Sequence, residues 1–357
     1  MSIIFAGDFL PLRPFGESPF PDDAKLVANL ECAISTSTVS SSKAYSMVLG
    51  SEAIDAVVQS RFAALSVANN HVRDAGDKAL DRMIKTIAQR DGPLLYGTRD
   101  KPYAVVTDGE QRCAVIGCLE RCRSRGNTLF REEDVASLIH DLAAHHDRVF
   151  VTPHWGKEGE CASHPSPRQQ KLARKWLDAG ATAVLGHHSH AFHGRQPYRG
   201  SLIYYSLGNL LFDTGESRYP LTRFGLAVTW TAGDALEDDD WRETILFQSK
   251  GCVTQLDAEC EDLLGAYLED ISADICTSAW NHLRWARAVG PVYIPYSNTS
   301  WRRRLHGSSA FRNRLLYLIW CVLPTTVLLR LGYWLPDPRI TSRRQRIEDE
   351  MQRKLER

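Results

Sequence analysis

Five clusters of carboxylate, amide and imidazole side chains follow short apolar runs in the first part of the chain. They stand in the segments FAGDFLP, VANLECAIS, ALSVANNHVRDAG, VFVTPHWGKEGE and TAVLGHHSHAFHG. Short apolar runs are typical of buried strands, which fix the backbone while the loop beyond presents polar side chains. Divalent cations of the hard and borderline classes prefer oxygen and imidazole ligands. The pattern therefore predicts a metal-dependent hydrolase with its ligands at strand ends.

Six side chains of these clusters form the candidate ligand set. They are Asp8, Glu31, Asn70, His154, His188 and His190. This set suits two divalent ions of the manganese, iron or zinc class, roughly 3.5–4 Å apart, that activate a bridging water and hold phosphoryl oxygens. His188 and His190 can both face one site if Ser189 points away, and His187 competes with His188 for the same role.

Other polar residues have both a catalytic and a simpler interpretation. His71 stands three residues before Asp74, which could orient the imidazole while His71 protonates a leaving alkoxide; alternatively, His71 only positions its neighbours. ANNH could also form an Asx-rich turn that caps a helix starting at Asp77. Glu158 and Asn209 are expected to support the ligands before they contact substrate.

The alternation of apolar runs and amphipathic segments over residues 1–213 predicts an α/β fold. The expected strands, rich in Val, Ile or Leu, are Ile3–Ala6, Leu26–Leu30, Ala64–Val67, Ala104–Thr107, Cys113–Cys118, Arg148–Thr152, Ala183–Leu185 and Leu202–Ser206. The expected helices are Glu52–Arg61, Lys78–Gln89 and Arg168–Ala179. Phe224–Trp230 and Thr244–Ser249 are expected to be closing strands of the same domain.

The charge of the chain is balanced overall but uneven along its length. Basic and acidic residues both number 43, so composition gives no reason to expect a polyanionic partner. Arginines accumulate after Ala286, with few acidic residues before Glu348. Such asymmetry can mark a nucleic-acid or a membrane surface. Because aromatic and basic residues do not interleave near the five clusters, we do not expect nucleic acid as a partner.

The C-terminal part has a helical texture. We expect a main domain over residues 1–255 and a helical, arginine-rich extension over residues 256–357, with an apolar segment at residues 315–335. As a helix, the run Leu315–Leu329 reaches roughly 22 Å, short of the roughly 30 Å hydrocarbon core of a bilayer. Three interpretations stay open: a helix packed on the core, an interfacial anchor and a membrane span. The flanking arginines and aromatic residues suit an interface.

The clusters also carry a family resemblance. GDFLP, NLECAIS, SVANNHVRDAG, PHWGKEGE, LGHHSHAFHG and YYSLGNLLFD occur together and in this order. They resemble the bacterial capsule and poly-γ-glutamate synthesis proteins called CapA or PgsA, a family that looks like a branch of the calcineurin-like metallophosphoesterases. The resemblance covers roughly residues 3–230. It implies a four-layer α/β sandwich, in which helices flank two mixed sheets and a dinuclear metal centre lies between the strand ends.

The resemblance implies a role for each candidate residue. Asp8 looks like the aspartate of the first metal, Glu31 stands where a bridging aspartate is usual, and Asn70 resembles the amide ligand of the second metal. A metal-binding histidine two residues after the first aspartate is absent, since Leu10 stands there. His71 resembles the imidazole near the leaving group, and His154 resembles the histidine ligand of the second metal. His188 and His190 resemble the pair of histidines that completes the ligand set.

The resemblance implies a hydrolase of capsule or polyglutamate metabolism. Its substrate would be a phosphoester or a γ-glutamyl amide, in a small molecule or in an acidic polymer. The alternative is a non-catalytic assembly or export component of a membrane-associated synthase.

The expected location follows from the N-terminus and the cysteines. The N-terminal sequence shows no secretory signal, and most of the nine cysteines lie in apolar runs, as reduced buried thiols do. We expect a cytoplasmic protein, with peripheral attachment to the inner membrane as a hypothesis.

Overall fold

The computed structural model describes residues 2–12, 19–35, 46–120, 129–156, 159–212, 219–235, 238–249, 251–305 and 324–355. Two parts of the sequence-based predictions lie outside these ranges: Glu158, and residues 315–323 of the apolar segment.

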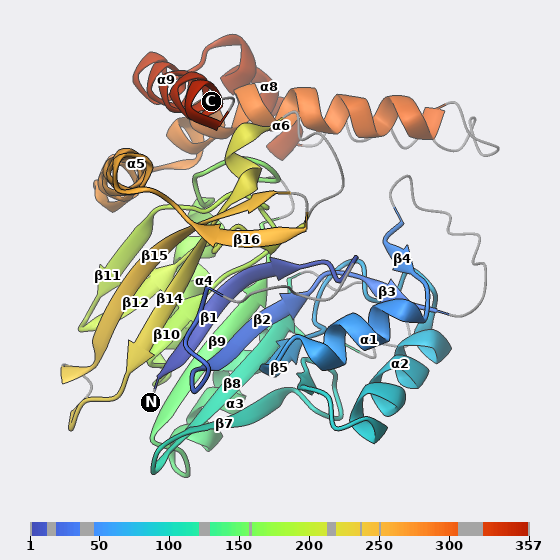
Figure 1. Ribbon diagram of the computed structural model, residues 1–357. Helices are drawn as coiled ribbons and strands as arrows, with labels where there is room; N and C mark the ends of the chain where they lie inside the picture. The colour runs from blue at the N-terminus through green and yellow to red at the C-terminus, as the bar shows by residue number, and fades with distance from the viewer. Residues whose placement is uncertain are drawn as a thin grey trace.

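Most strands belong to two mixed sheets (Figure 1). The first sheet has the order β16 (Cys252–Gln255), β15 (Asp240–Ser249), β14 (Phe224–Thr231), β1 (Ile3–Phe9), β2 (Lys25–Leu30), β5 (Phe62–Ser66) and β6 (Leu94–Tyr96), with β13 (Asn209–Leu211) also paired to β1. The second has the order β11 (Arg195–Tyr198), β12 (Ser201–Tyr204), β10 (Ala183–Leu185), β9 (Arg148–His154), β8 (Gln111–Leu119) and β7 (Tyr103–Asp108). A small pair joins β3 (Ala33–Ile34) to β4 (Val48–Leu49).

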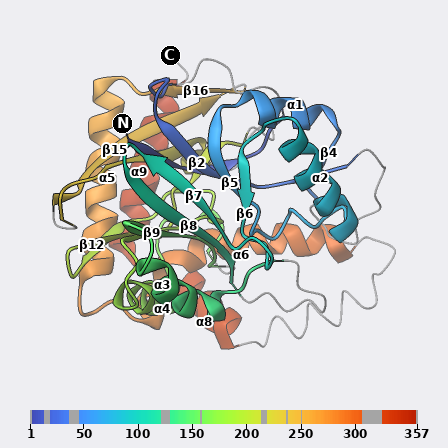
Figure 2. The same ribbon diagram turned by 90° about the horizontal axis from the view of Figure 1, so that it is seen from below.

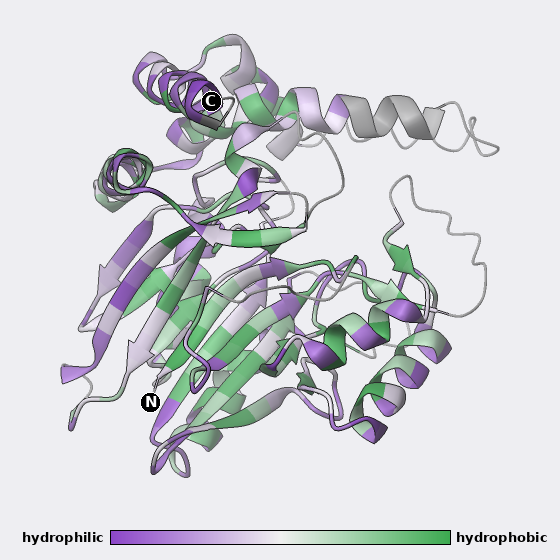
Figure 3. Ribbon diagram, in the orientation of Figure 1, coloured by the Kyte–Doolittle hydropathy of each residue, from purple (hydrophilic) through white to green (hydrophobic). Residues whose placement is uncertain are grey.

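Side-chain alternation along the strands builds the layers, because successive residues of a strand point to opposite faces. In β1, Ile3 and Phe5 belong to the core between the sheets, whereas Ile4 packs in the outer core with α1 (Glu52–Gln59) and α2 (Asp77–Gln89). In β9, Phe150 points into the central core and Val151 into the outer core with α3 (Val135–Ala143) and α4 (Pro167–Asp178). Figure 2 shows α1 and α2 on one side of the strands and α3 and α4 on the other. In Figure 3 the apolar residues gather in the strands at the centre of the molecule, and the outer strands carry more polar ones. The expected four-layer sandwich is confirmed.

The sequence-based elements agree with these strands and helices, and six observed strands and one helix were not among them. The additional elements are β3, β4, β6, β11, β13, β16 and α3. Strand β11 is an edge strand that contains a proline, so it lacks an apolar run. Helix α3 has buried residues at helical spacing, Val135, Ile139 and Leu142, so its signal was present in the sequence.

The chain after residue 257 forms α5 (Ala258–Cys276), α6 (His282–Leu305), α8 (Pro324–Trp334) and α9 (Pro338–Leu355). Helix α5 starts where Asp257 accepts a hydrogen bond from the amide of Cys260. Helices α5 and α9 add Tyr267 and Met351 to the central core, whereas α6 and α8 join the outer core of the second sheet. Within the described ranges, no helix has both the length and the apolar composition that crossing a bilayer requires.

Candidate metal centre

The candidate residues converge because the strands that carry them are parallel and end at the same edge. Asp8 on β1 is in register with Asn29 on β2 and with Asn209 on β13. From the second sheet, His154 at the end of β9 forms a bridge with His187, which follows β10. The polar residues at the strand ends of the first sheet therefore lie opposite those of the second sheet.

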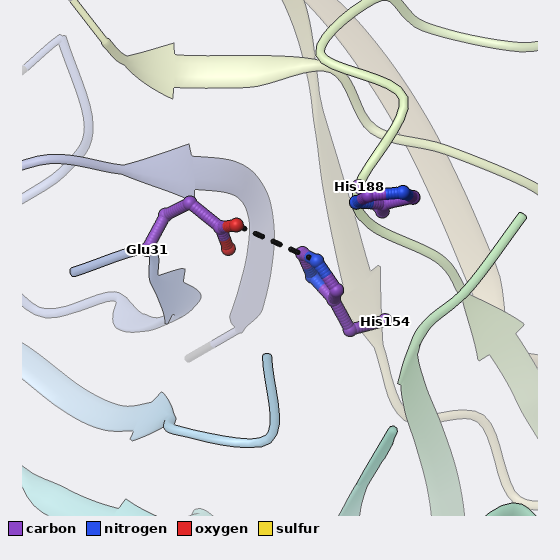
Figure 4. Close-up of side chains that lie close together, drawn as sticks. All are labelled: Glu31, His154 and His188. Carbon is purple, nitrogen blue, oxygen red and sulfur yellow. Dashed lines mark ion pairs between the residues drawn. The ribbon is translucent and has the colours of Figure 1, made fainter. Parts of the chain in front are cut away.

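Glu31, His154 and His188 form the tightest group (Figure 4). One ligand atom from each lies within 4.8 Å of the others, and all three residues are buried. His154 Nε2 lies 3.4 Å from Glu31 Oε1, and the rings of His154 and His188 have centroids 4.6 Å apart. Asn70 adds an amide oxygen, with its Oδ1 2.6 Å from His154 Nε2.

Asp8 centres the adjoining part of the site. Its carboxylate oxygens lie 3.2 Å from His187 Nδ1 and 3.3 Å from His190 Nδ1. The Nδ2 of Asn29 donates to Asp8 Oδ1 at 2.8 Å and to Glu31 Oε2 at 2.6 Å. Asn29 therefore holds the two carboxylates at a fixed separation and links both parts of the site.

These donors fit a divalent cation. Glu31 Oε1, His154 Nδ1 and His188 Nδ1 are buried and form no hydrogen bond within the described part of the chain. Buried polar atoms without partners cost free energy, and an unexplained one often marks a missing ion. Carboxylate, amide and imidazole donors, with no thiolate among them, suit manganese, iron or zinc.

His71 and Asp74 lie beside these donors as a pair. His71 Nδ1 is 2.7 Å from Asp74 Oδ2, and Asp74 also accepts a hydrogen bond from the amide of Met47. The Oδ1 of Asn69 accepts from the amides of His71 and Val72, so Asn69 makes the Asx turn that the ANNH sequence suggested. The helix-cap interpretation is wrong, because α2 has Gly76 at its N-cap and no capping side chain.

Asn209 supports His190. Its Oδ1 lies 3.0 Å from His190 Nδ1, and its Nδ2 donates to the carbonyl of Thr222. The ring of Phe212 packs against His190 with centroids 4.6 Å apart. Asn209 thus orients an imidazole, as expected for a group that supports a ligand.

Burial and neighbouring charges shift the pKa values of the buried carboxyl and imidazole groups of the site, some upward and some downward. Burial, followed by the charge of Asp8, raises the pKa of Glu31 well above its usual value. Burial works against ionisation of Asp8 as well, but His187 and His190 outweigh it, so the pKa of Asp8 lies well below its usual value. Burial also disfavours a charged His190, yet Asp8 outweighs it and raises the pKa of His190 to about 9. Burial lowers the pKa of His154 well below its usual value, with His188 adding to the effect.

The loop after β10 holds two histidines in the left-handed backbone region. The φ of His188 is +97° and that of His190 is +61°. Non-glycine residues rarely adopt such angles, and strain of this kind gathers at functional sites because surrounding contacts impose it. This conformation brings His187, His188 and His190 to the same site, where the sequence had left His187 and His188 as competitors.

One further acidic residue reaches the site without having been singled out in the sequence. Glu160 Oε1 lies 3.5 Å from His188 Nε2. The segment GKEGE contains two glutamates two residues apart, and only Glu158 was considered. A surface hollow of about 550 Å³ lies elsewhere, along α4 and beside Tyr198, and contains none of the candidate residues.

The fold and the site define a two-sheet α/β protein with a buried cluster of candidate metal ligands between its strand ends. The family model "Bacterial capsule synthesis protein PGA_cap" matches residues 22–214, and the chain belongs to this family. The resemblance to the capsule synthesis family, predicted from the motifs, is confirmed.

Relatives match over part of their length. The chain is 31% identical to the capsule biosynthesis protein CapA of Bacillus anthracis, over 47% of this chain and 44% of that protein. It is 29% identical to the PGA biosynthesis protein CapA of Bacillus subtilis, over 47% of each. A probable polyglutamine synthesis accessory protein of Mycobacterium tuberculosis is 27% identical over 42% of this chain and 44% of that protein. The matches thus span less than half of these relatives.

Solved structures show weaker similarity. A hypothetical protein from Thermus thermophilus superposes with a TM-score of 0.46 and 13% identity, over 70% of this chain and all of that one. A putative 5'-nucleotidase from Staphylococcus aureus superposes with a TM-score of 0.45 and 13% identity, over 76% of this chain and 58% of that one.

Proposed function

We propose that the protein is a metal-dependent hydrolase of the capsule synthesis family. The observation that supports this best is the buried group Glu31, His154 and His188, with ligand atoms within 4.8 Å of one another. A buried, ionised carboxylate whose oxygen accepts no hydrogen bond destabilises the fold, and a cation bound there would compensate its charge.

The proposed cofactors are two divalent ions of the manganese, iron or zinc class. When bound, such ions lower the pKa of a coordinated water and hold anionic oxygens of a substrate. Their proposed ligands are Asp8, Glu31, Asn70, His154, His188 and His190.

The protein's own groups position the ligands and move a proton. Asn29 and Asn209 fix the carboxylates and His190 through the hydrogen bonds given above. Asp74 occupies the Nδ1 side of His71, which leaves Nε2 as the nitrogen that delivers a proton to a leaving oxygen or nitrogen. His71 is 8% exposed, so that nitrogen acts in a largely water-free setting.

The proposed substrate has a phosphoester or a γ-glutamyl amide bond, in a small molecule or an acidic polymer. The capsule and PGA biosynthesis names of the Bacillus relatives support this setting. A second candidate is a non-catalytic component of polymer assembly, which the word "accessory" in the name of the mycobacterial relative favours.

Metal content tests the proposal first. Protein purified without chelator or histidine tag is analysed for metals, beside a His188→Ala/His190→Ala variant and a matched His145→Ala/His282→Ala control at exposed histidines. We expect about two ions per chain in the wild type and the control, and a clear loss in the folded site variant. If the wild type stays empty after manganese or zinc is added, the hydrolase proposal fails and the assembly component takes its place.

Activity then separates the two candidate functions. Metal-loaded protein is offered a phosphomonoester, a phosphodiester and a γ-glutamyl anilide, and hydrolysis is compared with that by His71→Ala. Turnover that falls by about 10²–10⁴ in this variant supports the hydrolase. Tight metal with no turnover of any substrate supports the assembly component.

We also propose a reducing compartment, the cytoplasm, for this protein. Seven cysteines in the described ranges are free thiols, and five of them are buried. Thiols persist in this form where glutathione and thioredoxin keep them reduced. Alkylation of thiols in intact cells before lysis, followed by mass spectrometry, tests this; extensive disulfide formation contradicts it.

A further inference from the structure

Large apolar side chains that remain exposed gather on one short helix, α8. Across the described residues, eight such side chains are at least 40% exposed, and five of these lie between Val327 and Leu335. The most exposed of all is Trp334, at 76%. Single exposed apolar residues are normal on a protein surface, whereas a contiguous group marks a binding surface.

The spacing of these residues places them on one face of α8. Val327, Leu331, Trp334 and Leu335 follow the i, i+4, i+7, i+8 pattern of a single helical stripe. We call these four residues the α8 patch; Tyr333, which is 40% exposed, borders it.

The opposite face of α8 is fixed against α6, so the α8 patch faces away from the core. Thr326, Leu329 and Gly332 are buried on that side. Gly332 contacts the backbone of Ala286 so closely that a β-carbon would collide with it, and Gly290 of α6 meets the Leu329 carbonyl in the same way. A helix held through its backbone cannot rotate to bury its other face. Figure 1 shows α6, α8 and α9 together at one end of the molecule.

Positive charge borders the α8 patch. Helix α8 contains Arg330 and no acidic residue. From α6, Arg287 donates to the carbonyls of Leu335 and Pro336 at 2.9 and 3.2 Å, which places a second guanidinium at the end of the patch. The exposed Arg339 follows at the start of α9, where Asp337 accepts from its backbone amide.

We infer that the α8 patch binds the surface of an anionic phospholipid bilayer. An apolar stripe with aromatic residues at one end and arginines around it is the pattern of a helix that lies in the membrane interface. Trp334 and Leu335 enter the headgroup region, while Arg287 and Arg339 face lipid phosphates. The 11 residues of α8 are too few to span the roughly 30 Å core, so contact stays at the surface.

The charge pattern favours a membrane over a second copy of the chain. In a two-fold contact the same patch would meet itself, so Arg287 and Arg339 would approach their own counterparts. Helix α8 offers no acidic side chain to compensate them. A layer of lipid phosphates compensates both guanidinium groups at once.

Vesicle co-sedimentation of the full chain tests this inference. The vesicles consist of phosphatidylcholine alone or of equimolar phosphatidylcholine and phosphatidylglycerol. The test variant is Leu331→Ser/Trp334→Ser, and Trp334→Phe is its conservative counterpart. The control is Leu94→Ser, which removes a side chain with similar exposure, 43% against 45% for Leu331, at the edge strand β6.

We expect wild type, Trp334→Phe and Leu94→Ser to bind the anionic vesicles. The double variant should bind at least about tenfold more weakly, because it loses much of the apolar area that the interface buries. Arg339→Gln should weaken binding to anionic vesicles and leave the residual binding to neutral vesicles unchanged. The inference is overturned if the wild type does not sediment with anionic vesicles, or if the double variant binds as well as the wild type. Concentration-dependent dimers that the double variant abolishes, without vesicle binding, would assign the patch to a second copy instead.

Discussion

The substitution Glu31→Gln should remove metal binding and at the same time stabilise the metal-free protein. Glu31 is fully buried, its Oε1 forms no hydrogen bond with described residues, and Asp8 lies close by. Glutamine keeps the shape and the contact with Asn29 but removes the charge. An uncompensated buried polar or charged group costs about 1–3 kcal/mol or more, so the metal-free variant should gain stability of about that size.

The metal response should change in the opposite direction. At ~100 times its Kd, an ion that binds only the folded state adds about 2.7 kcal/mol of stability. For a chain of 357 residues, this raises Tm by roughly 3–5 °C. We expect that increase in the wild type on addition of Mn²⁺, and little or none in Glu31→Gln.

Differential scanning calorimetry with chelator and with Mn²⁺ measures both effects. Glu243→Gln is the control, since Glu243 is a partly buried carboxylate whose ion pair with Arg195 lies outside the metal site, and its variant should keep the full metal response. A Glu31→Gln variant that responds to Mn²⁺ as the wild type does would show that Glu31 is no ligand. A metal-free variant that melts well below the wild type would show that the carboxylate is held by favourable contacts, and the reasoning from burial would be refuted.

Three other predictions concern the residue that positions the carboxylates, a glycine with a strained backbone, and the pH dependence of stability. Asn29→Ala should weaken Mn²⁺ binding by about 10–100-fold in calorimetric titration, because Asn29 holds both carboxylates, whereas Asn281→Ala, at the start of α6, should not change it. Gly208→Ala should destabilise the protein in urea unfolding by at least about 2 kcal/mol more than Gly109→Ala; both glycines have positive φ, but only at Gly208 would a β-carbon lie 2.9 Å from the backbone atoms of Phe192 and Phe224. Equal losses would contradict the steric argument. Burial lowers the pKa of His193 to about 3, so the unfolded state binds more protons below about pH 6.5 and stability falls as pH falls. From about pH 7.5 to about pH 5, wild type should therefore lose about 2 kcal/mol more than His193→Leu in urea unfolding, and parallel pH curves would refute this.

The sequence by itself determined the composition of the candidate site. Asp8, Glu31 and Asn70 follow apolar runs that had to be strands, and parallel strands place their ends at one edge. The clusters could therefore be assigned to one place before any coordinates, and the same periodicity predicted the α/β layers. The strands and helices could be predicted because side-chain alternation and turn residues are properties of short segments of the sequence.

Only the tertiary structure shows which side chains of the candidate metal centre contact one another. His188 turns toward His154 because the loop after β10 takes left-handed φ values that packing imposes and residue type does not predict. Asn29 joins Glu31, its near neighbour in the chain, to Asp8 on another strand, and Glu160 reaches His188 from a separate segment. The apolar segment of the extension was ambiguous for the same physical reason. Its composition suits a core and a membrane surface equally, and only the backbone contact of α8 with α6 determines which face remains exposed.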